Sequence, residues 1–163
     1  MKYLILLISF NLFACPQNLG HRVGGDIGDL EENTLETAKA VKPLENHACF
    51  TCWEFDINRA KGGLVVFHDT KYKGKKVKRV HLSKLGAPRL GEFVDGMPAL
   101  NPVKPLCFDV KEIKESDFTY VLAQAEKVSK KVPVRFLISH KRKSKYGKLM
   151  QLISSKGFPI GHY

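Results

Sequence analysis

The sequence predicts an α/β fold with a largely parallel sheet. Short runs rich in β-branched and aromatic residues alternate with segments whose apolar residues recur at helical spacing, and polar residues directly follow the strand-like runs. At 163 residues, 44% of them hydrophobic, the chain is long enough to bury one core, so one domain is expected. In parallel α/β folds, ligands bind at the carboxyl ends of the strands. The residues at those ends are therefore the candidate functional residues.

The N-terminal residues 1–14 are typical of an export signal. Lys2 precedes an apolar stretch at 3–13 that is too short to span a membrane as a mature helix. The run that ends at Cys15, Leu-Phe-Ala-Cys, resembles a bacterial lipobox, in which cleavage before the cysteine leaves that residue to carry a lipid. Cleavage elsewhere and a buried N-terminal strand are the alternatives. We therefore expect an exported bacterial protein, periplasmic or anchored to the membrane through Cys15, whose domain spans residues 15–163.

The pattern of the chain predicts each element in turn. A first strand is expected at 18–20, and a first helix at the Asn33-Thr34 step, where Asn33 and Glu36 resemble a capping box. Strands at 52–57 and 64–67 are joined by a tight turn, because the chain between them is too short for a crossover helix. The remaining elements are a strand at 106–110, a helix that starts at Ser116, a strand at 132–138, a helix at 146–155 that ends before Gly157, and a candidate strand at 158–162.

Charged residues end the first four expected strands. Positions two apart on a strand point to the same face, so Glu54 and Asp56 share one face, as do Asp109 and Lys111. Converging carboxylates suit a hard divalent cation, Mg²⁺ or Ca²⁺, and histidines beside them can exchange protons near neutral pH. The strand ends carry, in order, His21 and Arg22, Glu54 and Asp56, His68 and Asp69, and Asp109 and Lys111.

Ordered motifs in this sequence resemble those of the glycerophosphodiester phosphodiesterase family. They are His21-Arg22, Glu32-Asn33-Thr34, Glu54-Phe55-Asp56, the Gly62-Gly63 turn, Val65-Val66-Phe67-His68-Asp69 and Phe108-Asp109-Val110-Lys111. The resemblance implies a (β/α)8 barrel, the fold known as the TIM barrel, and hydrolysis of glycerophosphodiesters with a divalent metal.

The resemblance also implies roles for individual residues. The metal ligands would be Glu54, Asp56 and Asp109. The acid–base pair would be His21 and His68, and the phosphate contacts would be Arg22 and Lys111. Beside this set, Glu32 is expected to orient the first loop and Asn33 to cap the first helix.

The implied reaction is release of an alcohol and glycerol 3-phosphate, with the substrate's own glycerol hydroxyl as the attacking group. Two alternatives stay open: a phospholipase D-like enzyme acting on choline phospholipids, and a catalytically inactive barrel fragment that binds anions. Two residues depart from the family's pattern. The family usually has a glycine directly after His-Arg, where this chain has Val23 followed by Gly24 and Gly25, so the loop is expected to bend one residue late. Asp109 stands where glutamate is usual, which shortens its reach to a metal.

The chain supplies too few strands for the implied barrel. A (β/α)8 domain typically needs about 250 residues, and the pattern here supports five or six strands of eight. An incomplete barrel would expose unpaired strand edges, which template association. A shortened gene product, a reduced barrel patched by loops, and a homodimer in which two chains complete each other are the three explanations.

The net charge of +11 predicts an anionic partner. Lysine-rich segments at 71–84 and 140–148 would either attract anionic phosphodiesters or serve only as a solvated surface. Nucleic-acid binding is not expected, because aromatic residues are sparse in these segments and the chain has an export signal. The expected partner is a small-molecule phosphodiester.

The cysteines are expected to be structural. Cys49 and Cys52 have the spacing of a redox motif, but a local disulfide or two buried thiols fit the sequence better. Cys52 and Cys107 lie two residues before Glu54 and Asp109, so both point into the barrel interior below the metal site. With the strand at 64–67 placed between them, they are predicted to be packed thiols rather than a disulfide.

Overall fold

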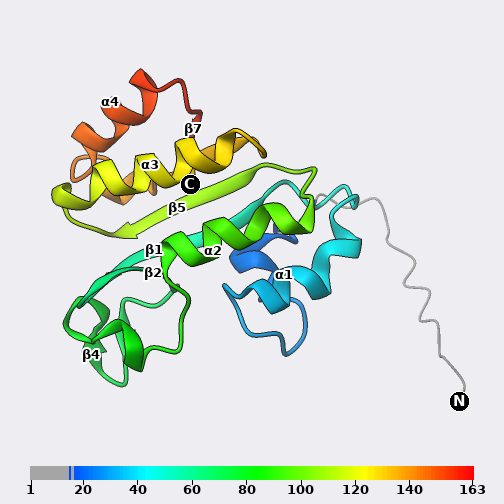
Figure 1. Cartoon of the computed structure of the whole chain (residues 1–163), viewed down its shortest axis with the longest axis horizontal. Coiled ribbons are helices and arrows are strands. Elements are labelled where there is room, and N and C mark those ends of the chain that lie inside the picture. The colour runs from blue at the N-terminus through cyan, green and yellow to red at the C-terminus, as the bar shows by residue number, and fades with distance from the viewer. Residues whose placement is uncertain (1–14, 16) are drawn as a thin grey trace, which may run out of the picture.

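The computed structural model describes Cys15 and residues 17–163 (Figure 1). The helices are α1 (Leu35–Val41), α2 (Leu90–Gly96), α3 (Phe118–Ser129) and α4 (Gly147–Ser155). The strands are β1 (Trp53–Ala60), β2 (Gly63–Val66), β3 (Lys71–Tyr72), β4 (Lys75–Lys76), β5 (Leu106–Glu112), β6 (Val134–Leu137) and β7 (Ile160–Gly161). Short 3-10 helices connect them, of which η1 (His21–Gly24) and η6 (Glu115–Asp117) matter below.

One mostly parallel sheet forms the centre of the molecule. Its strand order is β2-β1-β5-β6-β7, and every neighbouring pair is parallel except β1 with β2. In the part of the chain that the structure describes, β2 and β7 lie at the two edges. The structure therefore confirms the α/β class and the largely parallel sheet.

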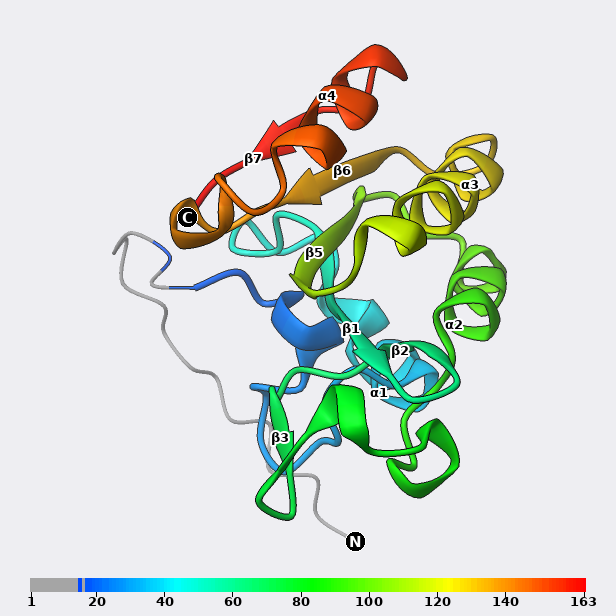
Figure 2. The same ribbon diagram turned by 90° about the vertical axis from the view of Figure 1, so that its left-hand side faces the viewer.

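The two faces of the sheet differ in chemistry. Phe55 of β1, Phe108 of β5 and Phe136 of β6 stack in a row with ring centroids 4.7 and 5.4 Å apart, and Phe93 of α2 packs onto Phe55. Figure 2 shows α2 and α3 on this side of the strands and η1 on the opposite side. Because side chains alternate along a strand, the residues directly before and after each of these phenylalanines along its own strand face η1. That second face carries the charged groups.

Two expected strands differ from the structure. Residues 18–20 form a turn leading into η1, because Asn18 Oδ1 accepts hydrogen bonds from the backbone N–H groups of Gly20 (3.1 Å) and Thr51 (2.8 Å), in competition with strand pairing. The strand at 64–67 exists as β2, but it is antiparallel and lies at the edge. It therefore does not separate β1 from β5.

Helix starts also differ in detail. Thr34, not Asn33, caps α1, since Thr34 Oγ1 accepts a hydrogen bond from the Thr37 backbone N–H at 3.1 Å. Ser116 lies within η6, and Asp117 instead accepts a hydrogen bond from the Lys114 N–H at 2.8 Å. The sequence analysis missed α2 altogether. The predicted end of α4 before Gly157 is confirmed.

All the cysteines form disulfides, which corrects the cysteine predictions. Cys52 pairs with Cys107 at a Cα–Cα distance of 6.0 Å, because β1 and β5 are neighbours. The packed-thiol prediction is therefore wrong. Cys49 pairs with Cys15 at 5.3 Å rather than with Cys52.

The Cys15 disulfide also bears on the predicted membrane anchor. A sulfur bonded to Cys49 cannot carry a lipid, so the structure contradicts lipidation of Cys15. The export signal predicted at 1–14 lies outside the described residues. Within the described chain, no helix has the length and apolar character needed to cross a bilayer.

Candidate active site

Three buried carboxylates meet on the face of the sheet opposite α2 and α3. Glu54 and Asp56 lie two residues apart on β1, and Asp109 of β5 is the direct neighbour of Asp56 across the parallel pair. One oxygen from each of the three lies within 4.8 Å of the others. The clustering predicted from the period of the strands is present, and this group of three is called the carboxylate cluster below.

The carboxylate cluster holds more negative charge than its surroundings neutralise. Burial and the neighbouring Asp56 raise the pKa of Glu54 to about 9. Among the described residues, neither Glu54 Oε1 nor Asp109 Oδ1 has a hydrogen-bond partner, although both oxygens are buried. Buried carboxylate oxygens without donors are costly unless a cation compensates them. Oxygen-only ligands of this kind fit Mg²⁺ or Ca²⁺.

Among the residues that the structure describes, Lys111 is the cation that contacts the cluster from within the sheet. Its Nζ bonds Asp109 and lies 2.9 Å from Asp56 Oδ1. Although burial opposes it, the two aspartates raise the pKa of Lys111 above its usual value. The register of β1 and β5 shifts here: Ile57 pairs with Val110 and Asn58 with Glu112, which leaves Lys111 as an extra residue on β5. Such bulges re-aim side chains next to functional sites.

Tyr163 contacts both Lys111 and Asp109 at the cluster. This residue was not predicted from the sequence. Its hydroxyl lies 2.9 Å from Lys111 Nζ and 2.5 Å from Asp109 Oδ2. Burial and Asp109 raise the pKa of Tyr163 to about 12, so the phenol is a hydrogen-bond donor at neutral pH. Nothing in the local pattern around residue 163 indicates this contact.

The loop that enters η1 supplies a backbone donor to the cluster. The Arg22 N–H donates to Glu54 Oε2 at 2.7 Å. Arg22 and Val23 both have left-handed backbone conformations, with φ of 48° and 61°. The left-handed turn therefore starts at Arg22 and Val23, earlier than expected, and it continues through Gly24, where the bend was predicted, with φ of 89°. A β-branched residue at positive φ is strained by roughly 1–3 kcal/mol, which the packing of the fully buried Val23 side chain offsets.

His21 stands beside Glu54. Its Nε2 lies 3.6 Å from Glu54 Oε2, and its Nδ1 bonds Asp26. The Asp26 carboxylate holds the ring so that Nε2 faces the cluster. Asp26 was not predicted, although a carboxylate five residues after a histidine in the same glycine-rich loop was an available signal.

Arg22 links the second histidine to the first loop. Its Nη2 lies 2.8 Å from His68 Nε2, and its Nη1 donates to Glu32 Oε2 at 3.0 Å. Arginine has only donors, so His68 Nε2 accepts this hydrogen bond, and the ring proton of a neutral His68 sits on Nδ1, 3.2 Å from Asp69 Oδ1. Glu32 thus orients Arg22, in keeping with the role expected for it.

Two asparagines fix the cluster and its loops. The Asn33 side chain donates to Asp56 Oδ2 at 3.1 Å and accepts from the Asp56 N–H at 3.2 Å, so its partner is a carboxylate of the cluster and not the start of α1. Asn58 Nδ2 donates to the backbone carbonyls of Phe67 (2.7 Å) and His68 (3.2 Å). The loop that carries His68 is therefore tied to β1.

A cavity of about 260 Å³ opens beside these groups, with Glu54, Asp109 and Lys111 in its wall. The Cys52–Cys107 disulfide and His162 also line it. The cavity is large enough for a small polar molecule. A bound phosphate ester would meet carboxylates, a histidine and a lysine together.

Comparisons with known proteins show a likeness of fold to a solved structure. No protein-family model and no curated protein matches the chain. A solved structure of a phosphodiesterase from Oleispira antarctica, in complex with the product sn-glycerol-3-phosphate, resembles it with a TM-score of 0.53. The two chains are 16% identical, and the match covers 91% of this chain and 84% of the other. At this identity the likeness shows a shared fold.

Proposed function

We propose that this protein is a metal-dependent phosphodiesterase that hydrolyses glycerophosphodiesters to an alcohol and glycerol 3-phosphate. The observation that carries the proposal is the carboxylate cluster with His21 beside it and Arg22 connecting it to His68. The fold shared with a phosphodiesterase that binds glycerol 3-phosphate supports the same reaction class.

Glu54, Asp56 and Asp109 would hold a divalent cation. When bound, such an ion neutralises charge that develops on the phosphate oxygens. Glu32 and His68 hold the Arg22 guanidinium beside the second histidine, where it would bind a phosphate oxygen and keep the diester oriented. Lys111 would add a second positive charge from the opposite side of the cluster.

The two histidines would divide the proton transfers. In the first step, one accepts the proton of the attacking glycerol hydroxyl while the other donates a proton to the leaving alkoxide, which would release the alcohol and leave a cyclic glycerol phosphate. In the second step, water would open this ring to glycerol 3-phosphate, with the two histidines exchanging roles. Asp26 and Asp69 each lie at the Nδ1 atom of one ring, so Nε2 would be the atom that exchanges protons in each histidine. His68 Nε2 accepts a hydrogen bond from Arg22, and it would become free when the Arg22 guanidinium turns to the phosphate. This is the same pairing of an orienting carboxylate with an acid–base imidazole that serves other hydrolases.

The proposal extends to the architecture and the compartment. The parallel strands β1, β5, β6 and β7 would form part of the wall of a shortened (β/α)8 barrel, with the carboxylate cluster on its inner side. Two disulfides suit an oxidising compartment, which supports an exported protein.

The test measures release of glycerol 3-phosphate from glycerophosphocholine with Mg²⁺, with Ca²⁺ and with EDTA. We expect release that depends on one of the two cations and stops with the chelator. Glu36→Gln, an exposed carboxylate on α1, is the matched control and should behave as the unaltered protein. Absence of cation-dependent release from glycerophosphocholine, glycerophosphoethanolamine and glycerophosphoglycerol alike would contradict the proposal and favour an anion-binding protein. Release of choline from lysophosphatidylcholine, with glycerophosphocholine left intact, would favour the phospholipase D-like alternative.

A further inference from the structure

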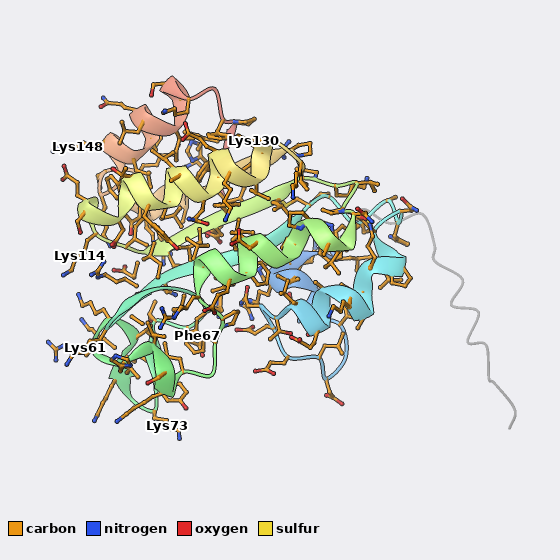
Figure 3. All side chains as sticks on the ribbon, viewed as in Figure 1. Lys61, Phe67, Lys73, Lys114, Lys130 and Lys148 are labelled. Atoms are coloured by element: carbon orange, nitrogen blue, oxygen red, sulfur yellow. A yellow bond between two sulfur atoms is a disulfide. The ribbon has the colours of Figure 1, made fainter. Side chains whose placement is uncertain are left out.

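A second cavity, of about 220 Å³, lies beyond the carboxylate cluster along the same two strands. Four cations line it against a single carboxylate, Glu112, which is already bonded to Lys145 at 2.8 Å. Figure 3 shows the labelled Lys61, Lys73 and Lys114 around this end of the molecule, whereas Lys130 lies toward the other end. The cavity is called the basic cavity below, and its cations are Arg59, Lys71, Lys76 and Lys78.

The β3–β4 hairpin places two of these cations against each other. Lys71 and Lys76 are direct partners in the antiparallel pair, and both line the basic cavity. Like charges directly opposite each other destabilise a strand pair. Among the described residues, neither lysine forms an ion pair with a carboxylate. An anion in the cavity would remove this repulsion, so the arrangement favours a bound anion.

The basic cavity and the carboxylate cluster are joined by β1. Asp56 and Asn58 share one face of β1, with Cα atoms roughly 7 Å apart at ordinary strand rise. Asn58 lines the basic cavity and also bonds the carbonyl of His68. Lys71 follows His68 by only three residues. The cluster and the basic cavity are therefore neighbouring sites along β1, at a spacing that a short oligomer can span.

We propose that the basic cavity binds a second phosphate group of the substrate. This inference rests on the proposed function and narrows it: the preferred substrates are glycerophosphodiesters whose alcohol part carries a further phosphate, such as short glycerol-phosphate oligomers. Four cations match a group with several anionic oxygens. Arg59 Nη1 already bonds Asp117, so its remaining N–H groups would bind the phosphate together with Lys71 and Lys76. A cationic head group such as choline would be repelled from the same cavity.

The test compares two substrates and two variants. The substrates are glycerophosphoglycerol, which has one phosphate, and a linear glycerol-phosphate trimer. The variants are Lys71→Gln/Lys76→Gln, and Lys130→Gln/Lys131→Gln as a matched pair of exposed lysines near the C-terminal end of α3. All four lysines are exposed, and none contacts the carboxylate cluster.

We expect the hairpin variant to lower kcat/KM for the trimer about tenfold, as two solvent-facing charges can, and to change kcat/KM for glycerophosphoglycerol less than twofold. The control variant should leave both substrates unchanged. The melting temperature of the metal-free hairpin variant should not fall, because the substitution removes repulsion. An equal loss on both substrates, or no loss on either, would overturn the proposal.

A binding measurement separates this inference from the proposed hydrolysis. Calorimetry in EDTA would measure binding of the trimer and of inorganic phosphate to the unaltered protein and both variants. If trimer binding weakens about tenfold only in the hairpin variant, the result supports the basic cavity as a phosphate site. This conclusion holds even if no diester is hydrolysed. In that case only the proposed function fails. Equal trimer binding in all three proteins overturns the site. Inorganic phosphate that binds as tightly as the trimer would identify a free anion as the ligand and overturn the substrate assignment.

Discussion

Glu45 and Glu54 are almost equally buried, with 2% and 3% of their surface exposed, yet their surroundings are opposite. Glu45 Oε1 accepts hydrogen bonds from the Trp53 indole (2.5 Å) and from the backbone N–H groups of Val103 and Lys104 (2.8 Å each). Its other oxygen bonds Lys42. Burial alone would raise the pKa of Glu45, but these donors outweigh it and lower the pKa.

Glu54 has the opposite balance. Glu54 Oε2 accepts a hydrogen bond from the Arg22 N–H. The Glu54 carboxyl also faces Asp56 and Asp109 across the cluster. Its pKa rises to about 9 because burial and Asp56 both disfavour its charge. A carboxylate whose oxygens are all satisfied stabilises the fold, whereas one whose oxygens face other carboxylates is arranged to bind a cation. Changing each in turn should separate stability from function.

The largest expected effect is on activity at the cluster. Glu54→Gln should lower kcat by about 10³-fold or more, because a metal site supplies several kcal/mol of transition-state stabilisation and each 1.36 kcal/mol is tenfold. The melting temperature of the metal-free protein should stay equal near neutral pH, because a pKa raised to about 9 leaves the Glu54 carboxyl uncharged there, as the glutamine amide is. Steady-state kinetics and thermal unfolding without metal test both points. A variant that melts much lower than the unaltered protein would place Glu54 with Glu45 as a structural group.

The histidines should affect turnover without affecting the metal. His21→Ala or His68→Ala should lower kcat by about 10² to 10⁴, the usual contribution of a general acid or base. Metal affinity measured by calorimetry should remain within a few-fold of the original. His140→Ala changes an exposed histidine outside the cavity and serves as the control. Full activity in both site variants would refute the acid–base assignment.

Glu45 should show the reverse pattern. Glu45→Ala should lower the free energy of unfolding by about 3–5 kcal/mol, because it leaves Lys42, the buried Trp53 indole and two part-buried backbone N–H groups without their acceptor. Metal affinity of the folded protein should not change. Denaturant unfolding measures the loss, with the exposed Glu36→Ala expected within about 0.5 kcal/mol of the original as control. A loss no larger than that of the control would mean that the Glu45 contacts contribute little.

The smallest effect is the pH dependence of stability at Glu45. A lowered pKa in the folded state means that the unfolded state binds more protons, so the contribution of Glu45 is present above the ordinary value of 4.5 and is lost as pH falls through the lower folded value. Between pH 5 and 3, the free energy of unfolding should fall less steeply in Glu45→Gln than in the original protein, by at most about 1.4 kcal/mol per pH unit. Parallel curves would contradict the lowered pKa.

Local patterns in the sequence determined much of the site. The two-residue period of a strand placed Glu54 and Asp56 on one face of β1, and Asp109 and Lys111 on one face of β5, since the direction of a side chain depends only on its position along its own strand. The alternation of strand-like and helical segments predicted the α/β class, because the period of each segment is also a local property of the sequence. The spacing of apolar residues and Gly157 likewise predicted α4 and its end.

The tertiary structure decided what joins distant segments. Strand order put β1 next to β5, which created the Cys52–Cys107 disulfide across 55 residues, and it brought Tyr163 to Asp109 across 54. Asn33 reads locally as a helix cap, yet it bonds Asp56, 23 residues away. Such partners depend on which strands become neighbours, and that choice is made by burial of the whole core. A sequence pattern that repeats every two or four residues does not determine which strands become neighbours.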